Sequence, residues 1–265
     1  MKDFKDKTVW ITGASSGIGK ALVHAFIKKG AMVIASSNEP GGLEKVKEEC
    51  GDLCDSVTCV PFDLSETHDI KNIVEKQLGK DGRIDILLNI GGISQRSIIE
   101  ETPLWLDRKI MEINYFGTIA FTKAILPYMI RQGSGHILAT SSISGSFGFP
   151  LRAAYSASKH ALHGFFETLY LENKKYNIRS SVIIPGRVKT RISYRALDAQ
   201  GNEHGKMDEG QAKGISPEKA ADIIIRGIRK NKREILVGNT ELIMFFIRKY
   251  LPCVFFRIAD RIKST

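Results

Sequence analysis

Short apolar runs alternate with amphipathic stretches along most of the chain. The runs are rich in Val, Ile and Leu, which is typical of strands, and the stretches between them carry apolar residues at helical spacing. The pattern predicts strands at 7–12, 31–36, 56–61, 84–89, 135–141, 178–184 and 234–237. It predicts helices at 17–29, 42–50, 67–79, 107–131, 153–176 and 216–230.

This alternation predicts a fold of the α/β class. Strands that alternate with helices form a parallel sheet covered by helices on both faces, and right-handed crossovers make such a sheet doubly wound. Since each expected strand is almost continuously apolar, both of its faces should be buried. We therefore expect one Rossmann-type domain of about seven strands at 1–239, followed by a C-terminal amphipathic extension at 240–265.

The segment 188–214 is a long stretch without a periodic pattern. It is rich in glycine and charged residues, and it follows the carboxyl end of an expected strand. A loop of this length in a compact domain is usually functional, and ligands of open α/β sheets bind at the carboxyl ends of the strands. We expect this segment to be a lid over a substrate.

Composition narrows the choice of partners. The formal net charge of +10 favours anionic partners such as phosphorylated cofactors, although a plain basic surface explains it equally well. The sequence has no signature of a nucleic-acid module, so we expect no nucleic-acid partner. Its four cysteines lack zinc-site spacings, which predicts free thiols and no metal. Without an apolar signal segment or a membrane-spanning run, the sequence predicts a cytoplasmic protein.

A glycine cluster, TGASSGIG at 12–19, joins the first expected strand to the first expected helix. Glycines let the backbone turn tightly and approach a phosphate closely, and a helix N-terminus offers free N–H groups and a positive dipole end. The alternative is a purely structural turn. The position between strand and helix favours a pyrophosphate site made by Gly13, Ser15, Ser16, Gly17, Ile18 and Gly19.

Tyr155 and Lys159 lie four residues apart in an expected helix and therefore share one of its faces. A tyrosine has a reference pKa of about 10, and a nearby cation lowers that pKa by favouring the phenolate. A phenol tuned in this way can protonate a carbonyl oxygen or deprotonate an alcohol. Such a pair also arises by chance on many helices.

Two further polar residues give this pair a context. Ser142 stands at the end of an expected strand, where its hydroxyl could orient a substrate oxygen. Asn114 lies inside an expected helix, although asparagine is a mediocre helix former. Its side chain either faces solvent or its own backbone, or it holds a water that connects Lys159 to solvent.

The GxxxGxG spacing of the glycine turn, with the set Asn114, Ser142, Tyr155 and Lys159, resembles the short-chain dehydrogenase/reductase family. The resemblance implies that these four residues are catalytic. It also implies that Tyr155 and Lys159 contact a nicotinamide cofactor together with Asp63, Leu64, Asn89, Gly91, Pro185, Gly186, Val188 and Thr190. Homodimers and homotetramers are usual in the family. Within it, segments 89–97, 155–162 and 251–256 resemble the dehydrogenase/reductase member 7 group.

The end of the second expected strand bears on the choice of cofactor. An acidic residue there would bind the adenosine 2′-hydroxyl of NAD(H) and repel the 2′-phosphate of NADP(H). The chain has Ser36, Ser37 and Asn38 instead, and Glu39 falls a few residues late. Although no arginine marks a phosphate site, this pattern favours NADP(H), with NAD(H) as the alternative.

The tail at 241–262 alternates apolar and basic groups. It either packs on the core or on a partner subunit, or it lies on a membrane surface as a basic amphipathic segment. The loop residues Ile93, Ile143, Phe147 and Phe149 indicate an apolar substrate such as a steroid, a retinoid or a lipid-like ketone.

Together these observations predict an oxidoreductase that interconverts a small-molecule ketone or aldehyde and an alcohol, with Tyr155 as general acid/base. One alternative is a regulatory or scaffold protein that binds a nucleotide on the same fold without turnover. Another is an epimerase or dehydratase on this fold.

Overall fold

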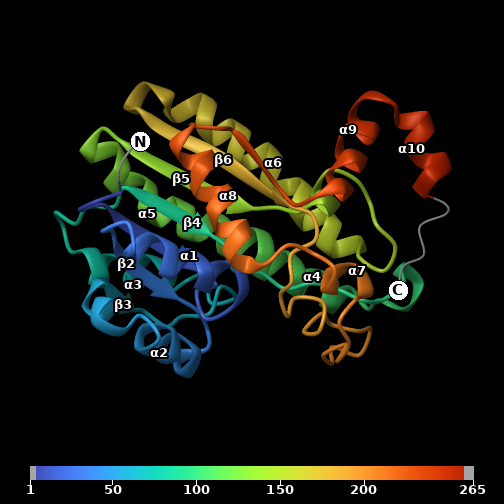
Figure 1. The fold of residues 1–265 in the computed structure, drawn as a ribbon, viewed down its shortest axis with the longest axis horizontal. Coiled ribbons are helices and arrows are strands. Elements are labelled where there is room, and N and C mark those ends of the chain that lie inside the picture. The colour runs from blue at the N-terminus through green and yellow to red at the C-terminus, as the bar shows by residue number, and fades with distance from the viewer. Residues whose placement is uncertain (1–3, 260–265) are drawn as a thin grey trace.

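The computed structural model describes residues 4–259. Seven parallel strands form one sheet in the order β3-β2-β1-β4-β5-β6-β7, with helices on both faces (Figure 1). This confirms the expected doubly wound fold. The strands are β1 (Thr8–Thr12), β2 (Met32–Ser36), β3 (Val57–Cys59), β4 (Ile86–Asn89), β5 (Gly135–Thr140), β6 (Ile178–Pro185) and β7 (Glu234–Val237).

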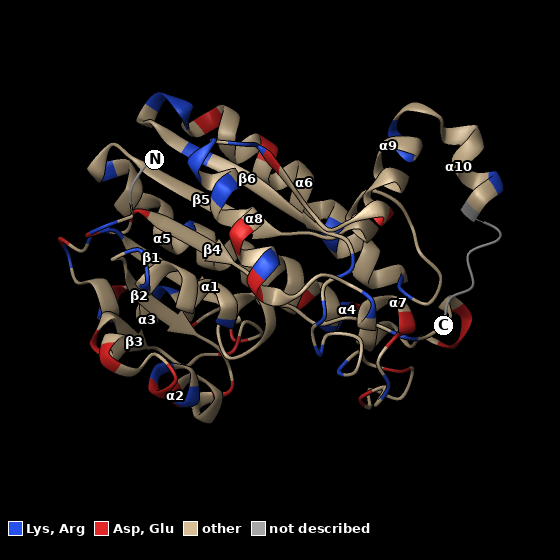
Figure 2. Ribbon diagram, in the orientation of Figure 1, with Lys and Arg blue, Asp and Glu red and all other residues tan. Residues whose placement is uncertain are grey.

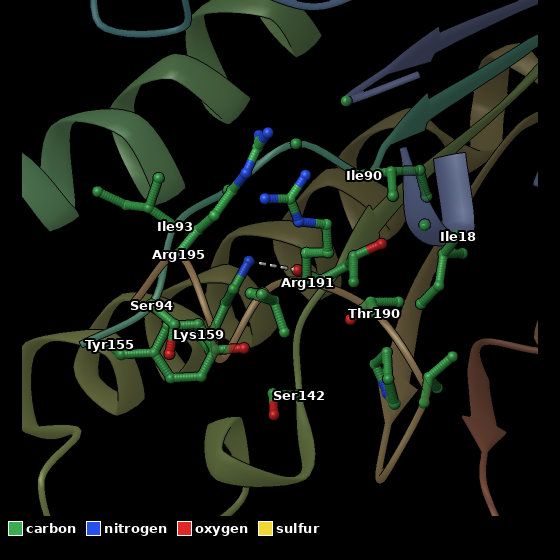
Figure 3. Close-up of a pocket in the computed structure, with 18 of the residues that line it drawn as sticks. Ile18, Ile90, Ile93, Ser94, Ser142, Tyr155, Lys159, Thr190, Arg191 and Arg195 are labelled. Carbon is green, nitrogen blue, oxygen red and sulfur yellow. Dashed lines mark hydrogen bonds between the residues drawn. The ribbon is translucent and has the colours of Figure 1, made fainter. Parts of the chain in front are cut away.

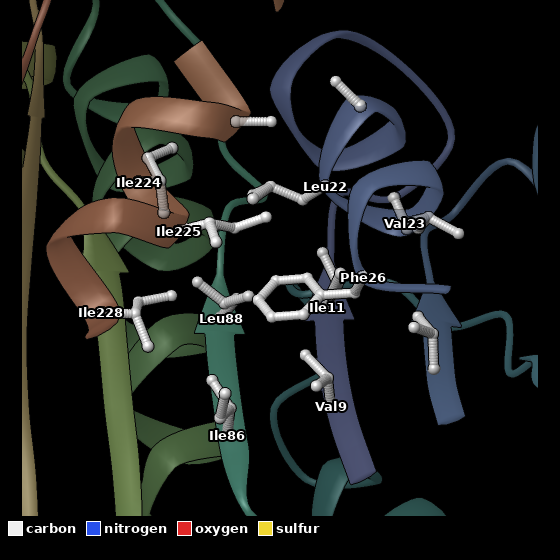
Figure 4. Close-up of a cluster of buried hydrophobic side chains, with 14 of the residues drawn as sticks. Val9, Ile11, Leu22, Val23, Phe26, Ile86, Leu88, Ile224, Ile225 and Ile228 are labelled. Atoms are coloured by element: carbon white, nitrogen blue, oxygen red, sulfur yellow. The ribbon is translucent and has the colours of Figure 1, made fainter. Parts of the chain in front are cut away.

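The two faces of the sheet are buried in separate apolar clusters. Val9 and Ile11 of β1 point into the first cluster, whereas Trp10 between them points into the second. The first is covered by α1 (Gly17–Ile27), α2 (Pro40–Glu48) and α8 (Pro217–Arg229), and Figure 4 shows α1 and α8 against β1 and β4. The second is covered by α3 (Ile70–Leu78), α5 (Thr118–Gln132) and α6 (Ala153–Asn173). Burial on both faces explains the nearly continuous apolar strands.

The strand order reverses between β1 and β4, and a crevice opens at their carboxyl ends. There the Thr12 hydroxyl accepts hydrogen bonds from the backbone N–H groups of Ile90 and Gly91, at 3.1 and 3.2 Å. The glycine turn and the loop after β4 are therefore held side by side.

The prediction of one continuous helix at 107–131 is wrong in two respects. A helix, α4 (Leu104–Met111), begins directly after Pro103, and a π-helical turn (Glu112–Gly117) separates it from α5. The turn packs closely on the loop after β3, since a Cβ at Gly117 would lie 2.4 Å from the carbonyl oxygen of Leu64. π-Turns inside α-helices often occur at functional sites, and this one contains Asn114.

The remaining elements are short. The loop at 188–214 contains α7 (Glu209–Ala212), and α9 (Ile243–Tyr250) and α10 (Pro252–Ala259) stand out from one end of the molecule (Figure 1). Residues 260–265 of the expected C-terminal extension lie outside the described residues. Among residues 4–259, none of the helices combines the length and the apolar character that crossing a membrane requires. Short 3₁₀ helices occupy Gly51–Ser56, Ile99–Glu101, Ile143–Gly145, Lys174–Tyr176 and Thr240–Leu242.

One histidine is buried in the sheet, and a second is partly buried beside it. His136 of β5 lies with Nε2 2.7 Å from the Ser181 hydroxyl of β6, and burial lowers its pKa to about 3. His163 of α6 lies with Nε2 2.8 Å from the Ser141 hydroxyl, and burial lowers its pKa to about 4. Both are therefore neutral in the folded protein near pH 6.

We expect the free energy of unfolding to fall as the pH drops from about 6.5 to about 5. In this window the unfolded chain protonates both histidines while the folded chain does not, so protonation favours the unfolded state. Each contributes a slope of at most about 1.4 kcal/mol per pH unit. Urea denaturation at several pH values measures the slope. His136→Gln should lower the slope while destabilising the protein at pH 8, and an unchanged slope would contradict the assignment.

Candidate active site

A cavity of about 750 Å³ lies at the carboxyl ends of the central strands. At one end it is lined by the glycine turn and the residues after β2, and at the other by Tyr155, Ser142 and part of the 188–214 loop. Figure 3 shows Tyr155, Ser142 and Lys159 on one side, with Arg191 and Arg195 reaching in from the loop.

The glycine turn has no room for side chains at two positions. A Cβ at Gly13, whose φ is +65°, would lie 2.7 Å from Cα of Gly91, and one at Gly19 would lie 2.1 Å from the carbonyl oxygen of Gly13. Ser16, at the start of α1, makes no capping hydrogen bond. The first N–H groups of α1 therefore meet the cavity without a side-chain cap, which suits the pyrophosphate of a dinucleotide.

Small polar residues follow β2. The Ser36 hydroxyl accepts a hydrogen bond from Trp10 Nε1 at 2.9 Å, so this side chain is engaged within the core. The Ser37 hydroxyl lies 2.9 Å from that of Ser15 and accepts from the N–H of Glu39 at 3.2 Å. Hydroxyl groups from both the glycine turn and the β2 end thus meet at this end of the cavity.

Asp63 lies beside them. Its carboxylate accepts from Asn38 Nδ2 at 3.1 Å and from the N–H and hydroxyl of Ser65 at 2.8 and 2.7 Å. Partial burial raises the pKa of Asp63, but the hydrogen bonds from Ser65 and Asn38 outweigh it and leave that pKa below its usual value. Asp63 is therefore a charged acceptor at neutral pH.

The first two turns of α6 carry Tyr155 and Lys159, as expected. The Lys159 ammonium donates to the carbonyl oxygen of Thr140 at 2.7 Å and lies 5.8 Å from the centre of the Tyr155 ring. Ser142, two residues after the end of β5, has a hydroxyl that lowers the pKa of Tyr155. All three side chains are buried and line the cavity.

The electrostatics of Tyr155 differ from the expectation based on Lys159. Burial raises the pKa of Tyr155, and this is opposed by the hydrogen bond from Ser142 and by the charges of Arg152 and Arg96. Burial also lowers the pKa of Lys159 to about 8. In the chain by itself, the cations that favour a Tyr155 phenolate are thus the two arginines.

Asn114 makes the contacts of a supporting residue. Its side chain accepts from the N–H of Ile93 at 2.8 Å and donates to the carbonyl of Ile93 at 2.9 Å and to the Ser158 hydroxyl at 3.0 Å. It joins the loop after β4 to α6 but does not line the cavity. The water-mediated link from Asn114 to Lys159 stays a prediction.

Asn89 is also turned away from the cavity. Its amide donates to the Thr122 hydroxyl and to the carbonyl of Leu138, both at 3.2 Å, and the side chain is buried. Asn89 therefore braces the end of β4. The other predicted residues all line the cavity: Gly13, Ser15, Ser16, Gly17, Ile18, Gly19, Ser36, Ser37, Asn38, Asp63, Leu64, Gly91, Ser142, Tyr155, Lys159, Pro185, Gly186, Val188 and Thr190.

Gln95 is a supporting residue that the sequence analysis missed. Its buried side-chain oxygen accepts from the N–H groups of Ala154 and Tyr155 at 3.0 and 3.5 Å. Arg152, at the N-cap position of α6, makes no capping bond, so Gln95 caps the helix from a distant loop. No local helix-start pattern could have revealed this.

A buried ion cluster lies near Tyr155. Asp208 of the 188–214 loop binds Arg96 Nη2 at 2.5 Å and Arg152 Nη2 at 2.8 Å, and all three side chains are at most 12% exposed. Burial and the neighbouring Arg96 lower the pKa of Arg152 to about 10. The cluster has one more cation than anion and fastens the loop beside the catalytic candidates.

Comparison with known proteins agrees with this geometry. The profile of the short chain dehydrogenases matches residues 7–201. The "Dehydrogenase/reductase SDR family protein 7-like" of Drosophila melanogaster is 41% identical over 96% of this chain and 80% of its own length. The "Dehydrogenase/reductase SDR family member 7B" of Xenopus tropicalis is 36% identical over 98% of this chain and 87% of its own length.

Solved structures share the fold. A short-chain dehydrogenase from Streptomyces avermitilis is 27% identical with a TM-score of 0.82, over 96% of this chain and 95% of its own. A Burkholderia phymatum protein in complex with NAD is 22% identical with a TM-score of 0.83, over 100% of this chain and 98% of its own. With the profile match and the near full-length relatives, this shows that the chain belongs to the short-chain dehydrogenase/reductase family and is an oxidoreductase.

Proposed function

We propose that the protein interconverts a ketone or aldehyde and an alcohol with NADP(H), and that Tyr155 is the general acid/base. The observation that carries the proposal is that the buried side chains of Tyr155, Ser142 and Lys159 line one end of a cavity whose other end suits a dinucleotide. A bound nicotinamide supplies or accepts the hydride.

In the direction of reduction, Tyr155 donates its phenolic proton to the carbonyl oxygen, and the Ser142 hydroxyl orients that oxygen. Because burial raises the pKa of Tyr155, the phenol is protonated at neutral pH. The phenolate that remains is stabilised by the charges of Arg152 and Arg96. Oxidation uses the same groups in reverse, with the phenolate as base.

The preference for NADP(H) is supported by the end of β2. An acid directly at this position would bind the 2′-hydroxyl and repel a phosphate. Ser37 and Asn38 stand there instead, and both line the cavity.

The substrate end of the cavity supports an apolar substrate. Ile93, Ile143, Phe147 and Phe149 line it, together with Met244 of α9. These apolar walls suit the apolar part of a carbonyl compound, while the charges of Arg96, Arg152 and Asp208 line the same cavity.

We also propose that α9 and α10 contact an anionic membrane surface. Ile243, Phe246, Tyr250, Leu251 and Phe256 are between 46% and 67% exposed. The charged residues of these helices are all basic: Arg248, Lys249 and Arg257 (Figure 2). An exposed apolar surface with a basic rim suits anionic lipid, whereas a second copy pairing through the same helices would bring like charges together.

Tyr155→Phe should lower kcat by about 10²- to 10⁴-fold, because phenylalanine keeps the ring but cannot transfer a proton. NADPH affinity should change little. Ketone-dependent oxidation of NADPH gives kcat, and calorimetry gives the affinity. Tyr128→Phe, at a buried tyrosine outside the cavity, is the matched control and should retain activity. Turnover that survives Tyr155→Phe would overturn the mechanism.

Two variants of the ion cluster should shift the pH dependence of alcohol oxidation in opposite directions. Arg152→Gln removes a charge that favours the phenolate, so the apparent pKa of Tyr155 should rise; Asp208→Asn leaves the two arginines unopposed, so that pKa should fall. The variable measured is kcat/KM against pH. Both substitutions break the Asp208–Arg152 pair. If both variants shifted the apparent pKa of Tyr155 in the same direction, the cause would be structural, and the electrostatic explanation would be contradicted.

The double variant Phe246→Ser/Phe256→Ser should lose most binding to vesicles that contain phosphatidylserine, because it removes apolar groups that would enter the lipid. Co-sedimentation of the full chain measures this binding, with phosphatidylcholine vesicles as the uncharged comparison. Leu171→Ser, at a residue of α6 that is 63% exposed, is the control. Equal binding by the double variant and the control would contradict the membrane proposal.

A further inference from the structure

The acidic residue nearest the end of β2 is paired with a cation from far along the chain. The Glu39 carboxylate accepts a hydrogen bond from Nη1 of Arg195, and both residues line the cavity. Arg195 belongs to the 188–214 loop, 156 positions later in the sequence. The negative charge of Glu39, which would repel an adenosine 2′-phosphate, is thus neutralised by Arg195, a residue far from it in the sequence.

The guanidinium of Arg195 has donors left over after this contact. A guanidinium carries five N–H groups. Nε of Arg195 is buried without a hydrogen-bond partner among the described residues. A buried donor without an acceptor is unfavourable, so a group that can accept from Arg195 would be stabilised here.

The surroundings supply further donors and a balanced charge. The hydroxyls of Ser15 and Ser37 lie 2.9 Å apart at the same end of the cavity, and Ser37 accepts from the N–H of Glu39. The other acid there, Asp63, is bonded by Asn38 and lies within the field of Lys109. Each carboxylate at this end is therefore offset by a cation.

We propose that Arg195 determines the cofactor specificity: it neutralises Glu39 and donates to the 2′-phosphate of NADP(H). This inference rests on the proposed preference for NADP(H) and assigns a part of that preference to the loop after β6, in addition to the end of β2. An arginine suits the role, because its planar guanidinium can bind a carboxylate and a phosphate at the same time.

Two nucleotide fragments test the role without any turnover. Adenosine 2′,5′-bisphosphate differs from adenosine 5′-monophosphate only by the 2′-phosphate, so the ratio of their affinities for the full chain, measured by calorimetry, isolates recognition of that group. Arg195→Gln should reduce the ratio about 10- to 100-fold, since it removes a charge-assisted hydrogen bond. Glu39→Gln should raise the ratio, because it removes a negative charge that repels the 2′-phosphate. Arg195→Lys, which keeps the positive charge, should give a ratio between those of Arg195→Gln and the wild type.

Arg191→Gln is the control within the same loop. Arg191 also lines the cavity, but its guanidinium lies over the ring of Tyr194, 5.3 Å from the centre. This variant should leave the ratio of the two affinities unchanged even if both affinities fall.

The outcomes separate this inference from the proposed function. If the wild-type protein prefers the bisphosphate and Arg195→Gln leaves the ratio unchanged, the role of Arg195 is overturned while the NADP(H) preference stands. If the wild-type protein binds both fragments equally or prefers the monophosphate, the NADP(H) preference fails and the role of Arg195 fails with it. Neither result bears on Tyr155 as the proton-transfer group.

Discussion

The hydroxyl of Thr12 joins the ends of β1 and β4, and the whole site depends on that join. By accepting from the N–H groups of Ile90 and Gly91, it sets the loop after β4 against the glycine turn, at the crevice where the strand order reverses. The close approach leaves no room for a Cβ at Gly13. The glycine turn and the start of the 90–96 loop are therefore held in a fixed position relative to each other.

The same loop then positions the chemistry. Ile93 is held by the amide of Asn114, Gln95 caps α6 at Ala154 and Tyr155, and Arg96 binds Asp208 of the 188–214 loop. Four parts of the molecule that are distant in sequence thus meet along seven consecutive residues. This explains why Asn114 can matter for the site without touching the cavity: it fixes the backbone between the cofactor turn and the helix that carries Tyr155.

Periodic and local patterns in the sequence were enough to predict the sheet, the helices around it and the glycine turn, because these depend on burial and on backbone geometry within a few residues. They also placed Tyr155 and Lys159 on α6 and Ser142 after β5, whereas the catalytic role of these residues came from the resemblance to the family. The start of α4 was set too late, although Pro103 marks it and Leu106 belongs to its buried face. The π-turn at Asn114 depends on contacts with Leu64 and Ile93. The contacts of Gln95, Asp208 and Arg195 join positions that no local pattern relates.

The 188–214 loop makes charged contacts at both ends of the cavity. Arg195 holds Glu39 at the adenosine end, and Asp208 holds Arg96 and Arg152 near Tyr155. In the proposed role of Arg195, a bound 2′-phosphate contacts the 188–214 loop. Asp208 of the same loop offsets the charges of Arg96 and Arg152, which stabilise the Tyr155 phenolate. The position of this one loop therefore sets the balance of charge at both ends of the cavity.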